Sequence, residues 1–223
     1  MLNDSGNEPM LYLVNTKGKI KKTYKIGAKN NDWEDLTTDD KGNIYIGDFG
    51  NNGNHRKNLA ILKFNISETN TSDTVNVERI SFKDPGQTAI TPARDKRHFD
   101  CESFFFYNDS LYLCTKSRSR DDFGRTDLYK LPSKPGEYQA TYISSFNTCE
   151  DISCWVTSAD ISPDKTKVVL LNYDTVWLFT GFKGDNFFNG KVTKLYLDDL
   201  SQKEGICFKD NKRPLKKSFS TYT

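Results

Sequence analysis

The 223 residues include 32 Lys+Arg and 30 Asp+Glu, which leaves a formal net charge of +2. This balance gives no reason to expect a nucleic-acid partner, because phosphate binding needs a concentrated basic face. Uncharged apolar runs such as 168–171 and 176–179 are far shorter than the roughly 20 residues of a membrane-spanning helix. We therefore expect one soluble globular domain, or a large piece of one, without a transmembrane segment.

The sequence predicts an all-β protein, because short alternating or continuous apolar runs recur between Gly, Asn, Asp and Pro, with almost no helical periodicity. Turn signals such as Asp40-Lys41-Gly42-Asn43 separate the runs and favour hairpins. The predicted strands are, in chain order, 10–15, 20–26, 33–38, 43–48, 59–65, 75–82, 101–107, 110–116, 127–131, 140–146, 156–162, 167–173, 175–180 and 191–196.

A loose repeat runs through these strands. An acidic motif, a strand, a turn and a second strand recur over 32–50, 100–117 and 157–174, and a fourth copy begins at 203–213. The spacing, about 45 to 70 residues with about four strands in each step, matches propeller blades with variable loops. We therefore predict a β-propeller of four-stranded antiparallel blades, with about four to five blades present.

The segment 66–98 is polar and contains one strand-like run. It is either an outer strand with a long connection between blades or a partly disordered insertion. The last ten residues, 214–223, show no strand pattern and are expected to form a tail unrelated to the repeat. The predicted organisation is thus a propeller over 1–213 and a tail over 214–223.

The repeats also carry a family resemblance. The stretches "NDSGNEPMLYLVNTKGKI" (3–20), "DWEDL" with "GNIYIGDFGNN" (32–52), "DCESFF" with "LYLCTKS" (100–117), "VTSADISPD" (156–164), "VVLLNYDTVWLF" (168–179) and "KEGICF" (203–208) resemble the bacterial phytase-like, or esterase-like, propellers. The resemblance implies a six-bladed ring, of which this chain would lack both closing ends, and an extracellular, periplasmic or outer-membrane-associated location. The opening residues themselves show no signal-peptide pattern.

The repeated acidic motifs are the main candidates for a site. Because the innermost strands of a propeller line one channel, motifs at their starts should place a ring of carboxylates around its opening. Such a ring persists chiefly around a cation, and hard oxygen donors without a histidine or thiolate cluster favour calcium. The predicted metal ligands are Asp4, Asp32, Glu34, Asp48, Asp100, Glu102, Asp160 and Glu204, with Asp35 beside them.

A structural role competes with this interpretation. An acidic residue at a strand start often accepts backbone N–H groups at a tight turn and so fixes how blades pack. The pairs Asp32 with Glu34 and Asp100 with Glu102 have strand-period spacing, so both members of each pair point to one face. That spacing favours a shared site for these four residues.

A second group of residues is expected to bind the ligand at the channel mouth. It consists of Lys116, Arg118, Asn51, Asn52 and Tyr173. Lys116 and the nearby arginines would suit a phosphate ester beside calcium, whereas in the alternative account they belong to a solvated loop paired with its own aspartates. No G-x-S-x-G motif is present, and no residue is assigned a catalytic role.

Two functions therefore remain open. The first is a monomeric binding protein whose channel face takes a small molecule or a protein partner, with calcium stabilising that face. The second, which the family resemblance implies, is a calcium-dependent phosphoesterase of the phytase-like kind. Of the five cysteines, Cys149 and Cys154 are close enough in the chain for a small disulfide in an oxidising compartment, or are simply half-apolar packing residues.

Overall fold

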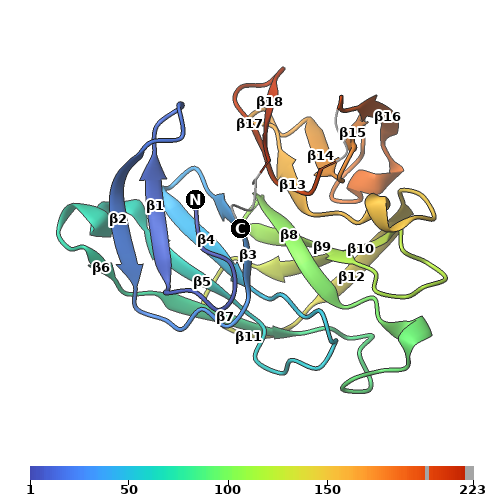
Figure 1. Ribbon diagram of the computed structural model, residues 1–223, viewed down its shortest axis with the longest axis horizontal. Coiled ribbons are helices and arrows are strands. Elements are labelled where there is room, and N and C mark those ends of the chain that lie inside the picture. The colour runs from blue at the N-terminus through green and yellow to red at the C-terminus, as the bar shows by residue number, and fades with distance from the viewer. Residues whose placement is uncertain (199–200, 219–223) are drawn as a thin grey trace.

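The computed structural model describes residues 1–198 and 201–218, which form strands, turns and four short 3-10 helices (Figure 1). The strands make five sheets in chain order, which we call blades 1 to 5. No helix among the described residues has the length and hydropathy to cross a membrane.

The blades are composed as follows. Blade 1 contains β1 (Met10–Val14), β2 (Ile20–Ile26) and β6 (Thr74–Val75). Blade 2 contains β3 (Trp33–Thr38), β4 (Asn43–Asp48), β5 (Ala60–Asn65), β7 (Glu78–Lys83) and β11 (Gly136–Gln139). Blade 3 contains β8 (Asp100–Tyr107), β9 (Ser110–Lys116), β10 (Arg125–Pro132) and β12 (Thr141–Asn147). Blade 4 contains β13 (Ser158–Ile161), β14 (Lys167–Leu171), β15 (Thr175–Thr180) and β16 (Lys191–Tyr196), and blade 5 contains β17 (Lys203–Phe208) and β18 (Pro214–Ser218).

The first strand of each of blades 2 to 5 lies innermost. Strand β3 packs beside β8, β8 beside β13, and β13 beside β17, and these strands face one another at the centre of Figure 1. Successive strands of blades 3 and 4 then pair antiparallel outward from that centre. This arrangement is that of a β-propeller, and it confirms the predicted all-β fold of four-stranded antiparallel blades.

Apolar side chains fill the spaces between neighbouring blades. Phe49 at the end of β4 meets Phe104 of β8 edge to face, with ring centroids 5.2 Å apart, and both belong to one buried cluster between blades 2 and 3. Phe146 and Phe179 make the same kind of contact at 5.0 Å between blades 3 and 4. Because alternate residues of each strand point to opposite faces, every inner blade contributes to two such clusters.

Two short strands link consecutive blades at their outer edges. Strand β6 follows blade 2's β5 in the chain but pairs parallel with β2 of blade 1, and β11 leaves blade 3 to pair parallel with β7 of blade 2. The segment 66–98 therefore contains two 3-10 helices, η1 (Ile66–Asn70) and η2 (Arg94–Lys96), together with β6 and β7. The single predicted strand 75–82 is two strands that belong to different blades.

The predicted tail needs one correction. Residues Pro214–Ser218 form β18, which pairs antiparallel with β17, so the expectation of no strand in this stretch was wrong. The fourth copy of the repeat thus contains a two-stranded unit within the described residues. Residues 219–223 of the predicted tail lie outside them.

Candidate functional site

The channel end of β3 lies beside that of β8, and each carries one of the acidic pairs. Asp32 directly precedes β3 and Glu34 lies within it, whereas Asp100 and Glu102 open β8. Since β3 and β8 are neighbouring inner strands, the structure brings the four carboxylates to one place. Each strand has a β-bulge beside its second carboxylate, between Trp33 and Leu36 and between Cys101 and Ser103.

Two cations from the end of β9 neutralise the β8 pair. Lys116 Nζ lies 2.6 Å from Glu102 Oε1, and Arg118 Nε lies 2.6 Å from Asp100 Oδ2. A second nitrogen of Arg118 lies 3.4 Å from Glu102 Oε1. Both partners of the Lys116–Glu102 pair are almost completely buried, so the alternative account of these cations as members of a solvated loop does not describe them. Arg125 does follow that account, because it pairs with Asp122 and Asp127.

Trp155 covers these two cations. Its ring centroid lies 5.2 Å from Lys116 Nζ and 4.6 Å from the Arg118 guanidinium carbon, within the range of a cation–π interaction. The indole N–H donates a 2.7 Å hydrogen bond to the carbonyl oxygen of Ser117. The sequence analysis missed this role, because a tryptophan preceding an inner strand by three residues has no local signal that distinguishes it from a core residue.

Asp32 and Glu34 have no such neutralisation. Among the described residues, no basic side chain lies within ion-pair distance of either carboxylate. Both carboxylates instead lie against the α-carbon of Gly50, where a Cβ would collide with them. A side chain at position 50 would therefore force the two carboxylates to shift.

The electrostatics of the site follow from this imbalance. Burial raises the pKa of Glu34 well above its ordinary value, and the nearby charges of Glu102, Asp100 and Asp32 raise it further. The pKa of Asp32 is also raised, chiefly by burial. For Glu102, burial and Asp100 outweigh the opposing effect of Lys116 and Arg118, so its pKa is raised as well. These carboxyl groups therefore hold their protons to a higher pH than free carboxyl groups do.

Asp48 and Asn51 lie next to this group but have structural partners. Asp48, at the end of β4, is fully buried and pairs with Arg56 at 3.0 Å. It also accepts hydrogen bonds from the Asn31 side chain and the Asp32 amide. The Asn51 amide donates to Asp100 Oδ1 at 2.7 Å, and its side-chain oxygen accepts from the amides of the next loop. Asn51 therefore holds the glycine-rich loop 47–58 on β8, and Asp48 ties the same loop to the start of β3.

The other predicted site residues lie apart from the four central carboxylates, except Asp4, an exposed loop residue that interacts with Asp32. Asn52 is exposed and its side chain makes no hydrogen bond among the described residues. Tyr173 accepts a hydrogen bond from Lys203 Nζ through its carbonyl oxygen, and Glu204 is exposed and bonded to the Gln202 side chain.

A second set of carboxylates joins the inner strands to one another. Asp35 of β3 accepts from the Phe104 amide of β8 at 3.4 Å and from the Ser158 hydroxyl of β13 at 3.5 Å. Asp160 of β13 accepts from the Phe208 amide of β17 at 2.7 Å. These contacts match the structural role considered for acidic residues at strand starts. Asp35 and Glu34 are consecutive and lie in the β-bulge of β3 between Trp33 and Leu36, where the regular alternation of side chains is interrupted.

The donor set limits how calcium would bind. No group of three or more His, Cys, Asp or Glu side chains among the described residues is arranged to hold a metal ion. Asp100 and Glu102 are engaged by cations, so Asp32 and Glu34 are the carboxylates left for a cation. Backbone carbonyl oxygens and water would have to complete its coordination.

Comparison with known proteins gives a fold-level likeness alone. No family model matches the chain, and no curated protein matches it. Among solved structures, a putative 6-phosphogluconolactonase from Bacteroides uniformis shares 14% identity at a TM-score of 0.48, with 96% of this chain and 58% of that chain covered. A protein from Lactobacillus plantarum shares 10% identity at a TM-score of 0.44, with 86% of this chain and 49% of that chain covered. A GH43 β-1,3-galactosidase shares 10% identity at a TM-score of 0.49, with 92% of this chain and 41% of that chain covered.

This chain therefore spans between two fifths and three fifths of the length of these structures. All three TM-scores are below 0.5, so these structures do not confirm the phytase-like family.

Proposed function

We propose that the protein is a binding protein whose channel mouth takes a positively charged ligand. We define the channel-mouth site as Asp32, Glu34, Asp100, Glu102, Lys116, Arg118 and Trp155. The observation that carries the proposal is the unequal pairing within the site. Asp100 and Glu102 each have a cation at 2.6 Å, whereas Asp32 and Glu34 share the space above Gly50 without one.

Calcium is the first ligand that fits this chemistry. Carboxylates brought together in a partly buried place repel one another and raise their pKa values, and a bound cation removes that cost. The expected role of calcium is to stabilise the channel face, with Asp32 and Glu34 as its side-chain ligands. An ammonium group of a small molecule or of a protein lysine would satisfy the same two carboxylates.

Binding is favoured over phosphate-ester hydrolysis by the position of the basic residues. Lys116 and Arg118 already donate to Glu102 and Asp100, and Trp155 lies over both of them. A phosphate group would have to compete with these carboxylates for the same cations. The phosphoesterase hypothesis therefore receives less support from the geometry.

The test is calorimetric titration of the chelated protein with calcium chloride, followed by the same titration with spermidine. We expect either cation to bind and to raise the melting temperature. The Glu34→Gln variant should lose this response, whereas the matched Glu78→Gln variant, at an exposed position on β7, should keep it. Because Glu34 must lose its proton to bind a cation, affinity should increase as the pH rises. Absence of binding by both cations would overturn the proposal.

The hydrolase hypothesis has its own assay. Activity on p-nitrophenyl phosphate and on phytate is measured with calcium, for the natural protein and for Asp32→Asn. Equal rates at background level are expected from a binding protein. Calcium-dependent turnover that Asp32→Asn abolishes would replace the binding proposal with the hydrolase one.

A further inference from the structure

We propose that the disulfide between Cys149 and Cys154 positions Trp155, so that reduction of this disulfide loosens Trp155 and weakens the channel-mouth site. The positioning of Trp155 stands on its own geometry. The effect on ligand affinity rests on the proposed function.

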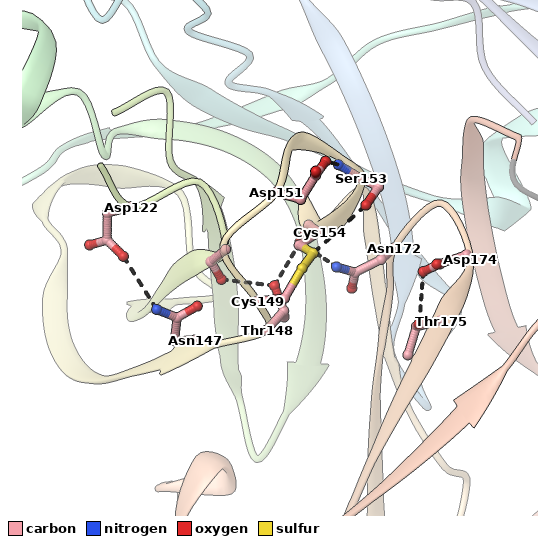
Figure 2. Close-up of a disulfide and its surroundings, with 11 residues drawn as sticks. Asp122, Asn147, Thr148, Cys149, Asp151, Ser153, Cys154, Asn172, Asp174 and Thr175 are labelled. Atoms are coloured by element: carbon pink, nitrogen blue, oxygen red, sulfur yellow. Dashed lines mark hydrogen bonds between the residues drawn. A yellow bond between two sulfur atoms is a disulfide. The ribbon is translucent and has the colours of Figure 1, made fainter. Parts of the chain in front are cut away.

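The disulfide closes the turn that connects blade 3 to blade 4. The two cysteines have their α-carbons 5.6 Å apart and flank an exposed pair of acidic residues and the 3-10 helix η3 (Ile152–Cys154). Figure 2 shows the disulfide within this turn, together with the residues around it. Trp155 is the next residue after Cys154 and caps η3, donating its amide N–H to the Ile152 carbonyl oxygen at 3.2 Å.

The turn is fastened on both sides of the bridge. The Thr148 hydroxyl lies 2.9 Å from the Gly124 carbonyl oxygen and 2.7 Å from that of Cys154. The Asn172 side chain also donates to the Cys154 carbonyl oxygen. Gly124 packs so closely on the backbone of Cys149 that a Cβ at position 124 would collide with it. The bridge therefore fixes the backbone from which the Trp155 side chain projects.

The Trp155 side chain has few other anchors. It lies outside the buried apolar clusters of the described residues. Its indole N–H bonds to Ser117, and Phe123 meets its ring edge to face at 5.8 Å. Its other ring contacts are the cations Lys116 and Arg118. A loosened turn would thus release the ring and change the position of the two cations that balance the site's negative charge.

The Cys149–Cys154 disulfide is accessible to a reductant. Cys149 is partly exposed and its neighbours Glu150 and Asp151 are exposed. Cys101 and Cys114 are buried thiols with pKa values raised by burial, so they remain protonated and unreactive. The pKa of the Cys207 thiol is also raised by burial, although that residue is exposed.

The reduction step needs a dithiol. One thiolate of the dithiol attacks a sulfur of the bridge, which breaks the Cys149–Cys154 bond, forms a mixed disulfide and releases the other cysteine as a thiolate that takes up a proton. The second thiol of the reagent then attacks the mixed disulfide. The dithiol leaves as a cyclic disulfide, and both cysteines are left as thiols.

The test follows Trp155 by fluorescence in the full chain, before and after dithiothreitol, and in the Cys149→Ala/Cys154→Val variant. Circular dichroism monitors the fold. We expect the reduced protein and the variant to remain folded while the acrylamide quenching constant of Trp155 rises about twofold, as a locally opened segment allows. Subtracting the signal of Trp155→Phe removes the contributions of Trp33 and Trp177, and Trp155→Phe itself should show no change on reduction.

Two outcomes would overturn the proposal. Unchanged quenching in both the reduced protein and the variant would show that Trp155 does not depend on the bridge. Global unfolding of both would show that the bridge holds the whole fold and not this side chain. Calcium and spermidine titrations of the same samples form a separate arm, in which affinity should change about fivefold or more as Lys116 and Arg118 move relative to the carboxylates. If reduction causes no change in Trp155 fluorescence quenching, the inference is refuted. If neither cation binds even the oxidised protein, only the proposed function is refuted.

Discussion

Replacing Asp160 by Asn should make the protein more stable at neutral pH, because the buried carboxyl group no longer has to ionise there. Burial raises the pKa of Asp160 from 3.8 to about 6, against the opposing effect of backbone N–H donors that include Phe208. A carboxyl group whose pKa is raised by folding holds its proton in the folded state after the unfolded chain has released it. The contribution of Asp160 to stability is therefore fully present below pH ~4 and is lost as the pH rises through about 6.

The size of the effect follows from the shift. A difference of about two pKa units at about 1.36 kcal/mol per unit corresponds to about 3 kcal/mol of unfolding free energy lost between pH ~4 and pH ~6. The asparagine variant keeps a side-chain oxygen to accept from the Phe208 amide, which is the 2.7 Å bond to β17, but it does not titrate. Its stability should therefore exceed that of the natural protein above pH 6 by up to this amount, less any weakening of the Phe208 bond.

Urea unfolding followed by tryptophan fluorescence at pH 4, 5, 6 and 7 measures the effect. Glu34 and Glu102, whose pKa values are also raised, titrate in both proteins and cancel in the difference between the two curves. The pKa of Asp35 is raised in part by the charge of Asp160, so Asp35 contributes to that difference together with Asp160. We expect that difference to grow over the pH 4–6 window and then to remain constant. Parallel curves from pH 4 to pH 7 would refute the reasoning.

Two further substitutions test the channel mouth. Gly50→Ala places a methyl group where the Asp32 and Glu34 carboxylates lie and should cost about 1–3 kcal/mol of stability. The control Gly86→Ala, whose Cβ would meet the Phe99 ring at 3.3 Å, should cost less. Equal melting temperatures of the two variants would contradict the crowding at Gly50. Lys116→Met leaves Glu102 buried beside Arg118 alone and should cost about 3–5 kcal/mol. The double variant Lys116→Met/Glu102→Leu should recover most of that loss in urea unfolding, and a double variant no more stable than Lys116→Met would count against a buried ion pair.

The structure divides the repeated acidic residues into two kinds. Asp35 and Asp160 accept hydrogen bonds from the next inner strands, and so they join blades. Asp32 and Glu34 face the channel mouth without a basic partner. The structural interpretation of the repeat therefore applies to Asp35 and Asp160, whereas the metal-ligand interpretation stays a prediction for Asp32 and Glu34.

Most strands follow from local patterns in the sequence. The predicted bounds of β2, β3, β4, β9, β15 and β16 agree with the structure residue for residue, because apolar alternation and flanking turn residues act over a few positions. The short strands β6 and β11 were missed. They exist because a neighbouring blade offers them an edge, which is information that lies elsewhere in the chain.

The sequence by itself determined the all-β class and the repeat, because apolar alternation and turn residues act over a few positions. It predicted that Asp32 and Glu34 meet Asp100 and Glu102, and the packing of β3 beside β8 brings them together. Tertiary structure alone decided that Lys116 and Arg118 would neutralise the β8 pair and that Trp155 would cover them. Ion pairs and ring contacts are formed in space between blades, and their partners have no fixed separation along the chain. The charged residues of the site were thus predictable, but their ion pairs and the position of Trp155 over them were not.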